Sequence, residues 1–336
     1  MRLLQLCGLL LPLFALVSPT CALALDGVTA VRTIGMTVSD LKRAERFYGE
    51  VLQFKLIEEA ELSGEDYEQL YGVTGLRMRV ARMRLGDEEI DLLNFLTPAG
   101  RPFPVDTRSN DHWFQHVALV VSDMTRAYAR LRAADVQHAS SGPQRLPDWN
   151  PQAGGIEAFY FRDPDGHYLE LIHFPPGRGA ARWQNTQGQL FQGIDHTAIV
   201  VEDTDASLHF YRDWLGMKIA GTSDNWGTEQ AHLNNVFGAH LRITALRAGQ
   251  GPGVELLEYL APHDGRPAPA DGRANDTWHW QVEFEAPTFN DRDASRSNSS
   301  YRAISSQPVA LPDGRARMYF DPDRHAVLIH EQKVHQ

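Results

Sequence analysis

Apolar and polar positions change period along the chain in a way that predicts a strand followed by an amphipathic helix. The apolar run His196–Val201 predicts a buried strand, and the acidic and hydroxyl residues at 202–205 are typical of a helix N-terminus. An apolar stripe at three- and four-residue spacing then predicts a helix that ends near Gly216. The stripe consists of Leu208, Tyr211, Trp214 and Leu215.

Three further predicted strands, at 218–220, 240–247 and 254–259, complete a βαβββ unit. A second unit repeats this order with a helix over 124–133 and strands over 156–161 and 167–174. The last two strands are joined by Asp163-Pro164-Asp165-Gly166, which is a strong hairpin signal.

The opening strand recurs four times, which predicts four related units. The opening segments are Thr33–Asp40, His116–Asp123, His196–Asp203 and Gln281–Ala286. The fourth unit is the most divergent, because its helix region at 291–305 is rich in serine and only weakly amphipathic.

The units are grouped in pairs by a longer duplication. The segment from Gly100 to Trp113 matches the segment from Gly265 to Trp278 without a gap, at an offset of 265 − 100 = 165. The first and third strand openings have nearly the same offset, 196 − 33 = 163. We therefore expect a first module pair at 28–183 (28–98 and 111–176) and a second at 192–334 (192–262 and 276–334), joined by a Pro- and Gly-rich linker.

Residues 1–24 have the three parts of a secretory signal peptide: Met1-Arg2, the apolar run Leu3–Val17, and Ala22-Leu23-Ala24. We expect cleavage after Ala24 and a secreted or periplasmic protein; an uncleaved N-terminal anchor is the alternative. The apolar run is shorter than the roughly 18–20 residues that a bilayer span needs.

Both cysteines, Cys7 and Cys21, lie inside this leader, so the mature chain is expected to contain no thiol. This excludes disulfides, cysteine nucleophiles and thiolate metal sites, and it suits an exported protein. Any metal ion must then be held by histidine, carboxylate or amide groups.

The composition, with 43% hydrophobic and 22% charged residues in 336, is that of a soluble globular protein large enough for two domains. The net charge of −11 argues against a nucleic-acid partner. We expect a small-molecule substrate, no membrane association after signal cleavage, and a monomer or homodimer. The basic run from Arg77 to Arg84 is interpreted as a solvated strand face rather than an anion site.

Four βαβββ units, histidine at the head of two first strands, and the motif Asp-Pro-Asp-Gly-His-Tyr-Leu-Glu170-Leu together resemble the vicinal oxygen chelate superfamily. Its members include glyoxalase I, bleomycin and fosfomycin resistance proteins, and extradiol dioxygenases. The resemblance covers essentially the whole mature chain. It implies an α+β fold in which the four βαβββ modules pair into two open, barrel-like glyoxalase/dioxygenase-type domains. A divalent metal ion is expected inside, on residues of first and last strands.

Carried over residue by residue, the resemblance implies three of four metal ligands in each barrel. The first barrel would offer Asp91, His116 and Glu170, with Thr33 at the fourth position. The second would offer His196, Glu255 and Gln281, with Leu328 as the gap. Three protein ligands are sufficient for a catalytic metal, and Fe, Mn, Zn and Ni are not distinguished.

Two further residues lie near these positions in the sequence, His279 and Tyr168. A slipped register would replace Gln281 by His279 and give a two-histidine, one-carboxylate triad with His196 and Glu255. Gln281 is preferred, because the ungapped match of Trp113 to Trp278 aligns it with His116. Tyr168 shares a strand face with Glu170 and is a candidate for a group that supports the ligand.

The resemblance implies an exported metal-dependent enzyme that chelates a small oxygen-bearing molecule through two oxygens, as an isomerase, lyase or ring-cleaving dioxygenase. Glu170 and Glu255 are the candidate catalytic bases. The alternative is a non-catalytic small-molecule or drug-binding protein of the bleomycin-resistance type. Glutathione-dependent activity is less expected outside the cytoplasm, and the sequence leaves open which barrel is active.

Overall fold

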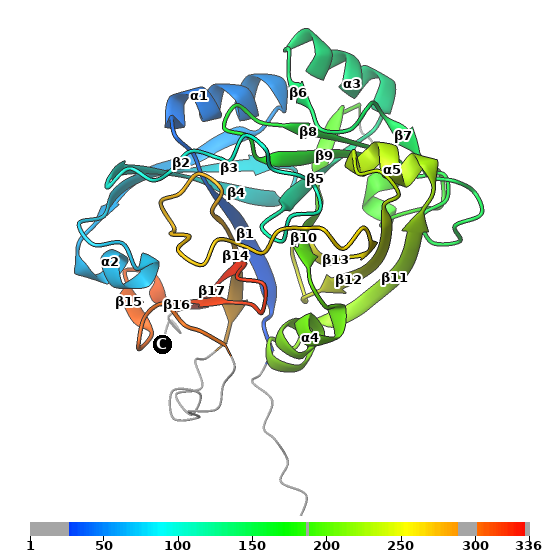
Figure 1. Cartoon of the computed structure of the whole chain (residues 1–336). Coiled ribbons are helices and arrows are strands. Elements are labelled where there is room, and N and C mark those ends of the chain that lie inside the picture. Colours follow the sequence, from blue (N-terminus) through cyan, green and yellow to red (C-terminus); the bar gives the residue numbers. More distant parts are fainter. Residues whose placement is uncertain (1–26, 186–187, 288–300, 333–336) are drawn as a thin grey trace, which may run out of the picture.

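The computed structural model describes residues 27–185, 188–287 and 301–332. The predicted signal peptide, residues 1–24, lies outside these ranges, as does most of the divergent segment 291–305. Figure 1 shows two strongly curved sheets side by side, with short helices around them. Within these ranges one sheet has eight strands and the other has nine, which confirms the α+β class and the two barrel-like domains.

The first half of the chain contains two modules. Module one consists of β1 (Ala30–Thr37), α1 (Leu41–Arg46), a π-helical turn (Phe47–Val51), β2 (Lys55–Ser63), α2 (Glu65–Tyr71), β3 (Arg77–Leu85) and β4 (Glu88–Thr97). Module two consists of β5 (Gln115–Val121), α3 (Met124–Ala133), β6 (Gln137–His138), β7 (Gln144–Arg145), β8 (Glu157–Arg162) and β9 (Tyr168–His173).

A 3-10 turn (Ala181–Gln184) leads into the second half. Module three consists of β10 (Phe191–Val201), α4 (Thr204–Leu208), a π-helical turn (His209–Trp214), β11 (Lys218–Trp226), α5 (Thr228–Asn234), β12 (His240–Arg247) and β13 (Gly253–Ala261). Module four consists of β14 (Trp280–Ala286), β15 (Val309–Leu311), β16 (Gly314–Phe320) and β17 (Ala326–Gln332).

Local sequence signals account for several of these boundaries. The predicted helix 124–133 and the predicted strand 240–247 have the observed bounds of α3 and β12. The helices α1, α3 and α4 each begin after an aspartate whose carboxylate accepts a hydrogen bond from the backbone of the first turn: Asp40, Asp123 and Asp203. The helices α2 and α5 are additional to the predicted βαβββ order.

The modules pair differently from the expectation that modules one and two share a barrel. β1 pairs antiparallel with β14, so modules one and four form one sheet, here called the outer barrel. β5 pairs antiparallel with β10, so modules two and three form the other sheet, here called the inner barrel. The predicted pairing of 28–98 with 111–176, and of 192–262 with 276–334, inside one barrel is therefore wrong.

Each curved sheet has a concave face and a face that carries the helices, and the duplication pattern does not tell which of the two joins the paired modules. The two modules of each half do pack together, but through the faces that carry the helices. One core joins Leu41 of α1 and Leu131 of α3 to both modules of the first half, and a second core does the same for modules three and four. In β5, Val117 and Leu119 belong to the first core, so alternation directs His116 to the opposite, concave face.

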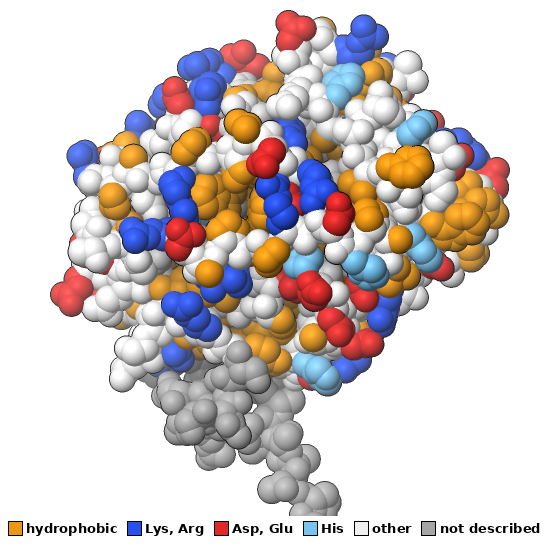
Figure 2. Space-filling view, in the orientation of Figure 1, with side chains coloured by type: hydrophobic (Ala, Val, Ile, Leu, Met, Phe, Trp, Pro, Cys, Tyr) orange, Lys and Arg blue, Asp and Glu red, His pale blue; other side chains and the backbone are white. Residues whose placement is uncertain are grey.

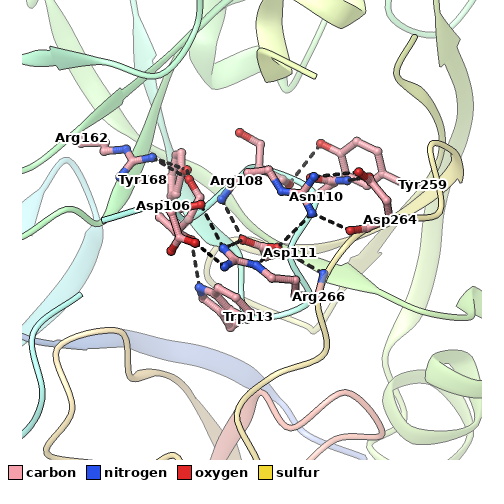
Figure 3. A network of polar contacts seen from close by, with 12 residues as sticks. Asp106, Arg108, Asn110, Asp111, Trp113, Arg162, Tyr168, Tyr259, Asp264 and Arg266 are labelled. Atoms are coloured by element: carbon pink, nitrogen blue, oxygen red, sulfur yellow. Dashed lines mark hydrogen bonds and ion pairs between the residues drawn. The ribbon is translucent and has the colours of Figure 1, made fainter. Parts of the chain in front are cut away.

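The connectors between modules exchange partners across the two halves. Arg266 of the second connector donates to both carboxylate oxygens of Asp111 in the first, at 2.9 and 2.7 Å, and stacks on Trp113 (Figure 3). The reciprocal pair is Arg101 with Asp276, at 3.1 and 2.7 Å. These ion pairs fix the crossing of the chain from one barrel to the other.

Acidic and basic side chains are interspersed on the face of the molecule shown in Figure 2. Within the described ranges, no helix has the length and apolar character needed to cross a membrane.

Candidate metal centre

Two histidines meet at the centre of the inner barrel because their strands run antiparallel. In the register of β5 and β10, each histidine lies opposite an alanine of the other strand, and each of these alanines pairs with a glutamate of a last strand. The concave face therefore gathers one histidine and one glutamate from each module. The four residues are His116, Glu170, His196 and Glu255.

Their side chains are close enough to share one ion. Glu170 Oε2 lies 3.0 Å from His116 Nε2 and 3.4 Å from His196 Nε2, and the two Nε2 atoms are 3.5 Å apart. Glu255 Oε2 lies 3.5 Å from His196 Nε2 and its side chain is 24% exposed, whereas the other three are buried. Across the described part of the chain, His116, Glu170 and His196 form the only group of three or more His, Cys, Asp or Glu whose possible ligand atoms lie within 4.8 Å of one another.

Opposite charges dominate the electrostatics of this group. Burial alone would raise the pKa of Glu170, but hydrogen bonds from His116 and His196 outweigh burial and lower the pKa to about 2. Burial also opposes charge on His196, yet Glu255, Asp195 and Glu170 raise its pKa well above the usual value. At neutral pH the metal-free site thus holds an ionised Glu170 and a protonated His196, and a cation can replace that proton.

The four side chains line a cavity of about 220 Å³. One group of its other lining residues is polar: Gln152, Thr222, Ser223, Asn225 and Gln230. A second group is apolar: Leu146, Ile156, Ile172, Phe174, Ile243 and Leu257. None of the described lining residues is a lysine or an arginine, so the cavity offers no cation to an anionic ligand.

Tyr160 also lines this cavity and is absent from the predicted site. It lies opposite Glu170 in the β8–β9 pairing, and its ring centroid is 4.8 Å from that of His116. Burial, followed by the charge of Glu170, raises the pKa of Tyr160 well above its usual value, so the phenol stays protonated. The hairpin turn that follows β8 fixes this cross-strand pairing and was the available signal.

The structure does not bring Asp91 to His116 and Glu170 as predicted, because β4 belongs to the outer barrel. Both oxygens of Asp91 instead accept hydrogen bonds from Arg82 at 2.9 Å. Arg82, which lies within the run interpreted as a solvated strand face, thus pairs with a buried carboxylate.

The structure does not bring Gln281 to His196 and Glu255 either, because β14 pairs with β1 and β17 and not with β10. Gln281 Oε1 lies 3.3 Å from His279 Nε2, so both residues are in the outer barrel and the alternative triad with His279 is not formed.

The remaining predicted positions have ordinary packing roles. Thr33 is buried with no hydrogen-bond partner for its hydroxyl among the described residues, and Leu328 lies in the apolar interior of the outer barrel. Tyr168 donates to the carbonyl of Thr107 at 3.1 Å and accepts from Arg162 at 2.6 Å, so its hydroxyl braces a connector.

A family model matches the chain, in agreement with its fold and with the four side chains of the candidate site. The model of the Glyoxalase/Bleomycin resistance protein/Dioxygenase superfamily matches residues 30–171 and 193–329. The chain belongs to this superfamily. The resemblance inferred from the repeats and the glutamate motif is therefore confirmed.

Individual superfamily members match the chain over different extents. A 2-epi-5-epi-valiolone epimerase from Actinomyces sp is 31% identical over 175 residues, which are 50% of this chain and 91% of that protein. A lactoylglutathione lyase from Schizosaccharomyces pombe is 25% identical over 326 residues, 88% of this chain and 94% of that protein. The crystal structure of glyoxalase I from Zea mays is 16% identical with a TM-score of 0.59, covers 90% of this chain and 92% of that one, and supports the fold alone.

Glyoxalase I relatives in the superfamily are metal-dependent, and the residues of the inner barrel fit a divalent ion. Two imidazole nitrogens and a buried carboxylate oxygen converge on one point, and Glu255 supplies a further oxygen beside them. Mixed nitrogen and oxygen donors suit Fe, Mn, Zn and Ni ions. The predicted cofactor, a divalent metal ion, agrees with this donor set.

Proposed function

We propose that this protein is a metal-dependent isomerase or epimerase that moves a proton beside a carbonyl group of a small, uncharged, hydroxylated substrate. One observation carries the proposal: a set of two histidines and two glutamates is complete in a cavity whose described lining has no lysine or arginine.

His116, His196 and Glu170 would hold the metal ion, because they are buried and make the closest mutual contacts. When bound, the ion supplies a Lewis acid that polarises neighbouring carbonyl and hydroxyl oxygens. Glu255 is the residue suited to move a proton, since it is partly exposed to the cavity and has one long contact, with His196. Its carboxylate can take the proton from the carbon beside the carbonyl and return it.

The rest of the cavity can select and orient a substrate of this kind. Hydroxyl and amide groups on one part of the lining, among them Thr222, Asn225 and Gln230, can bond to substrate hydroxyls, and Ile172 and Leu257 can pack on its carbon skeleton. The buried, protonated hydroxyl of Tyr160 can donate a hydrogen bond beside His116.

The relatives that match the chain support different substrate classes. Similarity to a valiolone epimerase supports proton transfer on a neutral, hydroxylated ring. Similarity to lactoylglutathione lyases supports the same metal chemistry on a glutathione conjugate. A conjugate of that tripeptide carries carboxylates, and the described lining of this cavity offers them no cation, so we favour the neutral class.

Hydrogen exchange with solvent tests the proposal. The protein loaded with Mn, Fe, Zn or Ni is incubated in D₂O with neutral cyclic and open-chain hydroxyketones, and the reaction is followed by NMR. We expect metal-dependent deuterium incorporation beside the carbonyl together with an epimer or isomer. Preferential turnover of lactoylglutathione would overturn the neutral substrate class. Stoichiometric binding without exchange would instead support the non-catalytic alternative, and oxygen uptake with a catechol would support a dioxygenase.

We also propose that the protein is exported and that residues 1–24 are removed. The order of charged, apolar and small residues supports this, as does the confinement of both cysteines to that segment. N-terminal sequencing of the protein from a secreted or periplasmic fraction should begin at Leu25. A cytoplasmic chain that retains Met1 would overturn the proposal.

A further inference from the structure

Asp195 also lines this cavity and places an additional carboxylate beside the ring of His196. Its Oδ2 lies 3.1 Å from Nδ1 of His196, whereas the other ring nitrogen, Nε2, faces Glu170. Consecutive strand residues normally point to opposite faces. The register between β10 and β5 shifts between Ile194 and His196, and this β-bulge lets Asp195 reach the ring of its own neighbour.

Two side chains hold Asp195 in this position. Trp183 Nε1 donates to Oδ1 at 2.8 Å, and Arg247 donates to Oδ2 at 2.9 Å and to the backbone carbonyl of Asp195 at 2.8 Å. Asp195 and Trp183 are both buried. Every carboxylate oxygen of Asp195 therefore has a fixed donor, and its orientation toward His196 is set by the fold.

Trp183 lies in the 3-10 turn Ala181–Gln184 between modules two and three, and contacts with module one hold this turn in place. Arg182 stacks on the Trp183 ring at 3.9 Å and forms an ion pair with Glu88 of module one. At Gly193 a Cβ atom would lie 2.9 Å from Trp183 Cη2 and 2.5 Å from Glu88 Oε2, so only glycine fits there without rearrangement. The connecting segment thus reaches the metal centre through Trp183 and Asp195.

This support is confined to one histidine and one barrel. Nδ1 of His116 has no hydrogen-bond partner among the described residues. The residue equivalent to Asp195 in module one, at the offset 195 − 32 = 163, is Arg32, whose guanidinium lies 2.8 Å from Glu283. The barrel that lacks a complete ligand set therefore also lacks this carboxylate.

We propose that Asp195 is a positioning residue that fixes the ring of His196 with Nε2 toward the metal, and that Trp183 fixes Asp195. The inference rests on the proposed metal-dependent function. A carboxylate bonded to the second nitrogen of a ligand histidine sets the ring orientation and tautomer, and loss of such a partner typically lowers metal affinity or activity by ~10–100-fold.

Titration of the full-length mature protein with Co²⁺, followed by its visible absorption, tests the inference. Asp195→Asn should weaken Co²⁺ affinity by ~10–100-fold and alter the absorption spectrum. Trp183→Phe removes the indole donor while keeping an aromatic ring, and it should shift both readouts in the same direction by a smaller factor. Asp91→Asn is the matched control, because it removes another buried, arginine-paired strand carboxylate from the outer barrel, and it should leave both readouts unchanged.

Equal Co²⁺ affinity and equal spectra for Asp195→Asn and the parent protein would overturn the inference and leave the proposed function intact. Failure of the parent protein to bind any divalent ion would overturn the proposed function instead. In that case the Nδ1 proton of His196, observed by NMR in the metal-free protein, still decides the inference. Its signal should be protected from exchange in the parent and lost in Asp195→Asn; unchanged signals would overturn it.

Discussion

The two barrels are built from similar modules with the same strand positions, but among the described residues only the inner barrel brings together a group of side chains that could hold a metal ion. Its four positions hold His116, Glu170, His196 and Glu255, each able to bind a metal. The equivalent positions of the outer barrel, in the same order, hold Gln281, Leu328, Thr33 and Asp91. The fold therefore supplies the arrangement, and the side chains decide whether it becomes a site.

The two barrels also differ in the residue that pairs with the acidic residue of the last strand. In the inner barrel Ala245 pairs with Glu255, which leaves the carboxylate free to face the cavity. In the outer barrel Arg82 pairs with Asp91 and binds both of its oxygens. An acid whose oxygens are both bound by a guanidinium is poorly placed to bind a metal or to accept a proton.

The largest expected effect comes from removing the proposed base. Glu255→Gln should lower kcat by ~10²–10⁴-fold, the usual contribution of a positioned general base. Co²⁺ should still bind, because His116, His196 and Glu170 remain. Steady-state kinetics and Co²⁺ titration measure the two effects. Asp91→Asn is the counterpart in the outer barrel, and an equal loss of kcat in that variant would contradict the assignment of chemistry to the inner barrel.

Local patterns in the sequence predicted the βαβββ modules, and the resemblance to the superfamily implied the candidate ligand positions. Alternation placed His116 and Glu170 on one strand face each, and the repeats aligned them with His196 and Glu255. The sequence did not predict which modules share a barrel, because that depends on the pairing of β5 with β10. The duplicated first strands are so similar that their sequences do not distinguish one pairing partner from another. One signal was present in the residues: only the pairing of modules two and three completes a set of four ligands.

Residues that act through distant contacts were beyond the local patterns. Asp91 and Glu255 occupy the same sequence pattern, and the difference between them lies across the sheet, in Arg82 and Ala245. Asp195 would be expected to face away from His196, and only the β-bulge brings the two side chains together. Such contacts are set by register, which sequence periodicity does not determine.

Making the inner barrel resemble the outer one is the second way to test the comparison. In Ala245→Arg the guanidinium should pair with Glu255, as Arg82 does with Asp91, and fill part of the cavity. Overpacking typically costs ~1–3 kcal/mol of folding stability, and the filled cavity should in addition bind ligand more weakly. Calorimetric ligand titration and kcat/KM measure the effect. Ala245→Met, similar in length but uncharged, separates filling from pairing; unchanged binding in both variants would refute the role given to Ala245.

The third test of the comparison is proton release on metal binding, and the metal affinity it controls should depend on pH. The pKa of His196 is raised in the metal-free protein, whereas Glu170, with a pKa of about 2, is already ionised above pH 5. Metal must therefore displace a proton from His196 below its raised pKa, and affinity should fall about tenfold for each pH unit lost there. Above that pKa this dependence should vanish.

Calorimetric metal titration in buffers of different ionisation enthalpy counts these protons directly. We expect about one proton released per metal ion at neutral pH. The Asp91→Asn variant should release the same number, since its carboxylate belongs to the outer barrel. Binding without proton release would show that His196 is neutral before the metal arrives.

The smallest expected effect concerns Thr33, the outer-barrel equivalent of His196. Its buried hydroxyl has no hydrogen-bond partner among the described residues, and such a group costs about 1–3 kcal/mol. Thr33→Val replaces the hydroxyl by a methyl group of similar size. We expect a gain in stability of up to ~1 kcal/mol, or a rise in Tm of ~2–4 °C, with unchanged kcat.

Thr197→Val is the matched variant of the inner barrel, because Thr197 is also buried in a central strand but its hydroxyl is fully engaged. It donates to the carbonyl of His116 at 2.7 Å and accepts from Gln115 Nε2 at 2.9 Å. Its removal takes one hydrogen bond from each of these partners and should lower stability by ~1–3 kcal/mol. It should also reduce turnover, because one of those partners is the backbone of a metal ligand. A loss of stability in Thr33→Val as large as that in Thr197→Val would mean that the outer barrel still uses this position, and the contrast between the barrels would then rest on Arg82 and Leu328 alone.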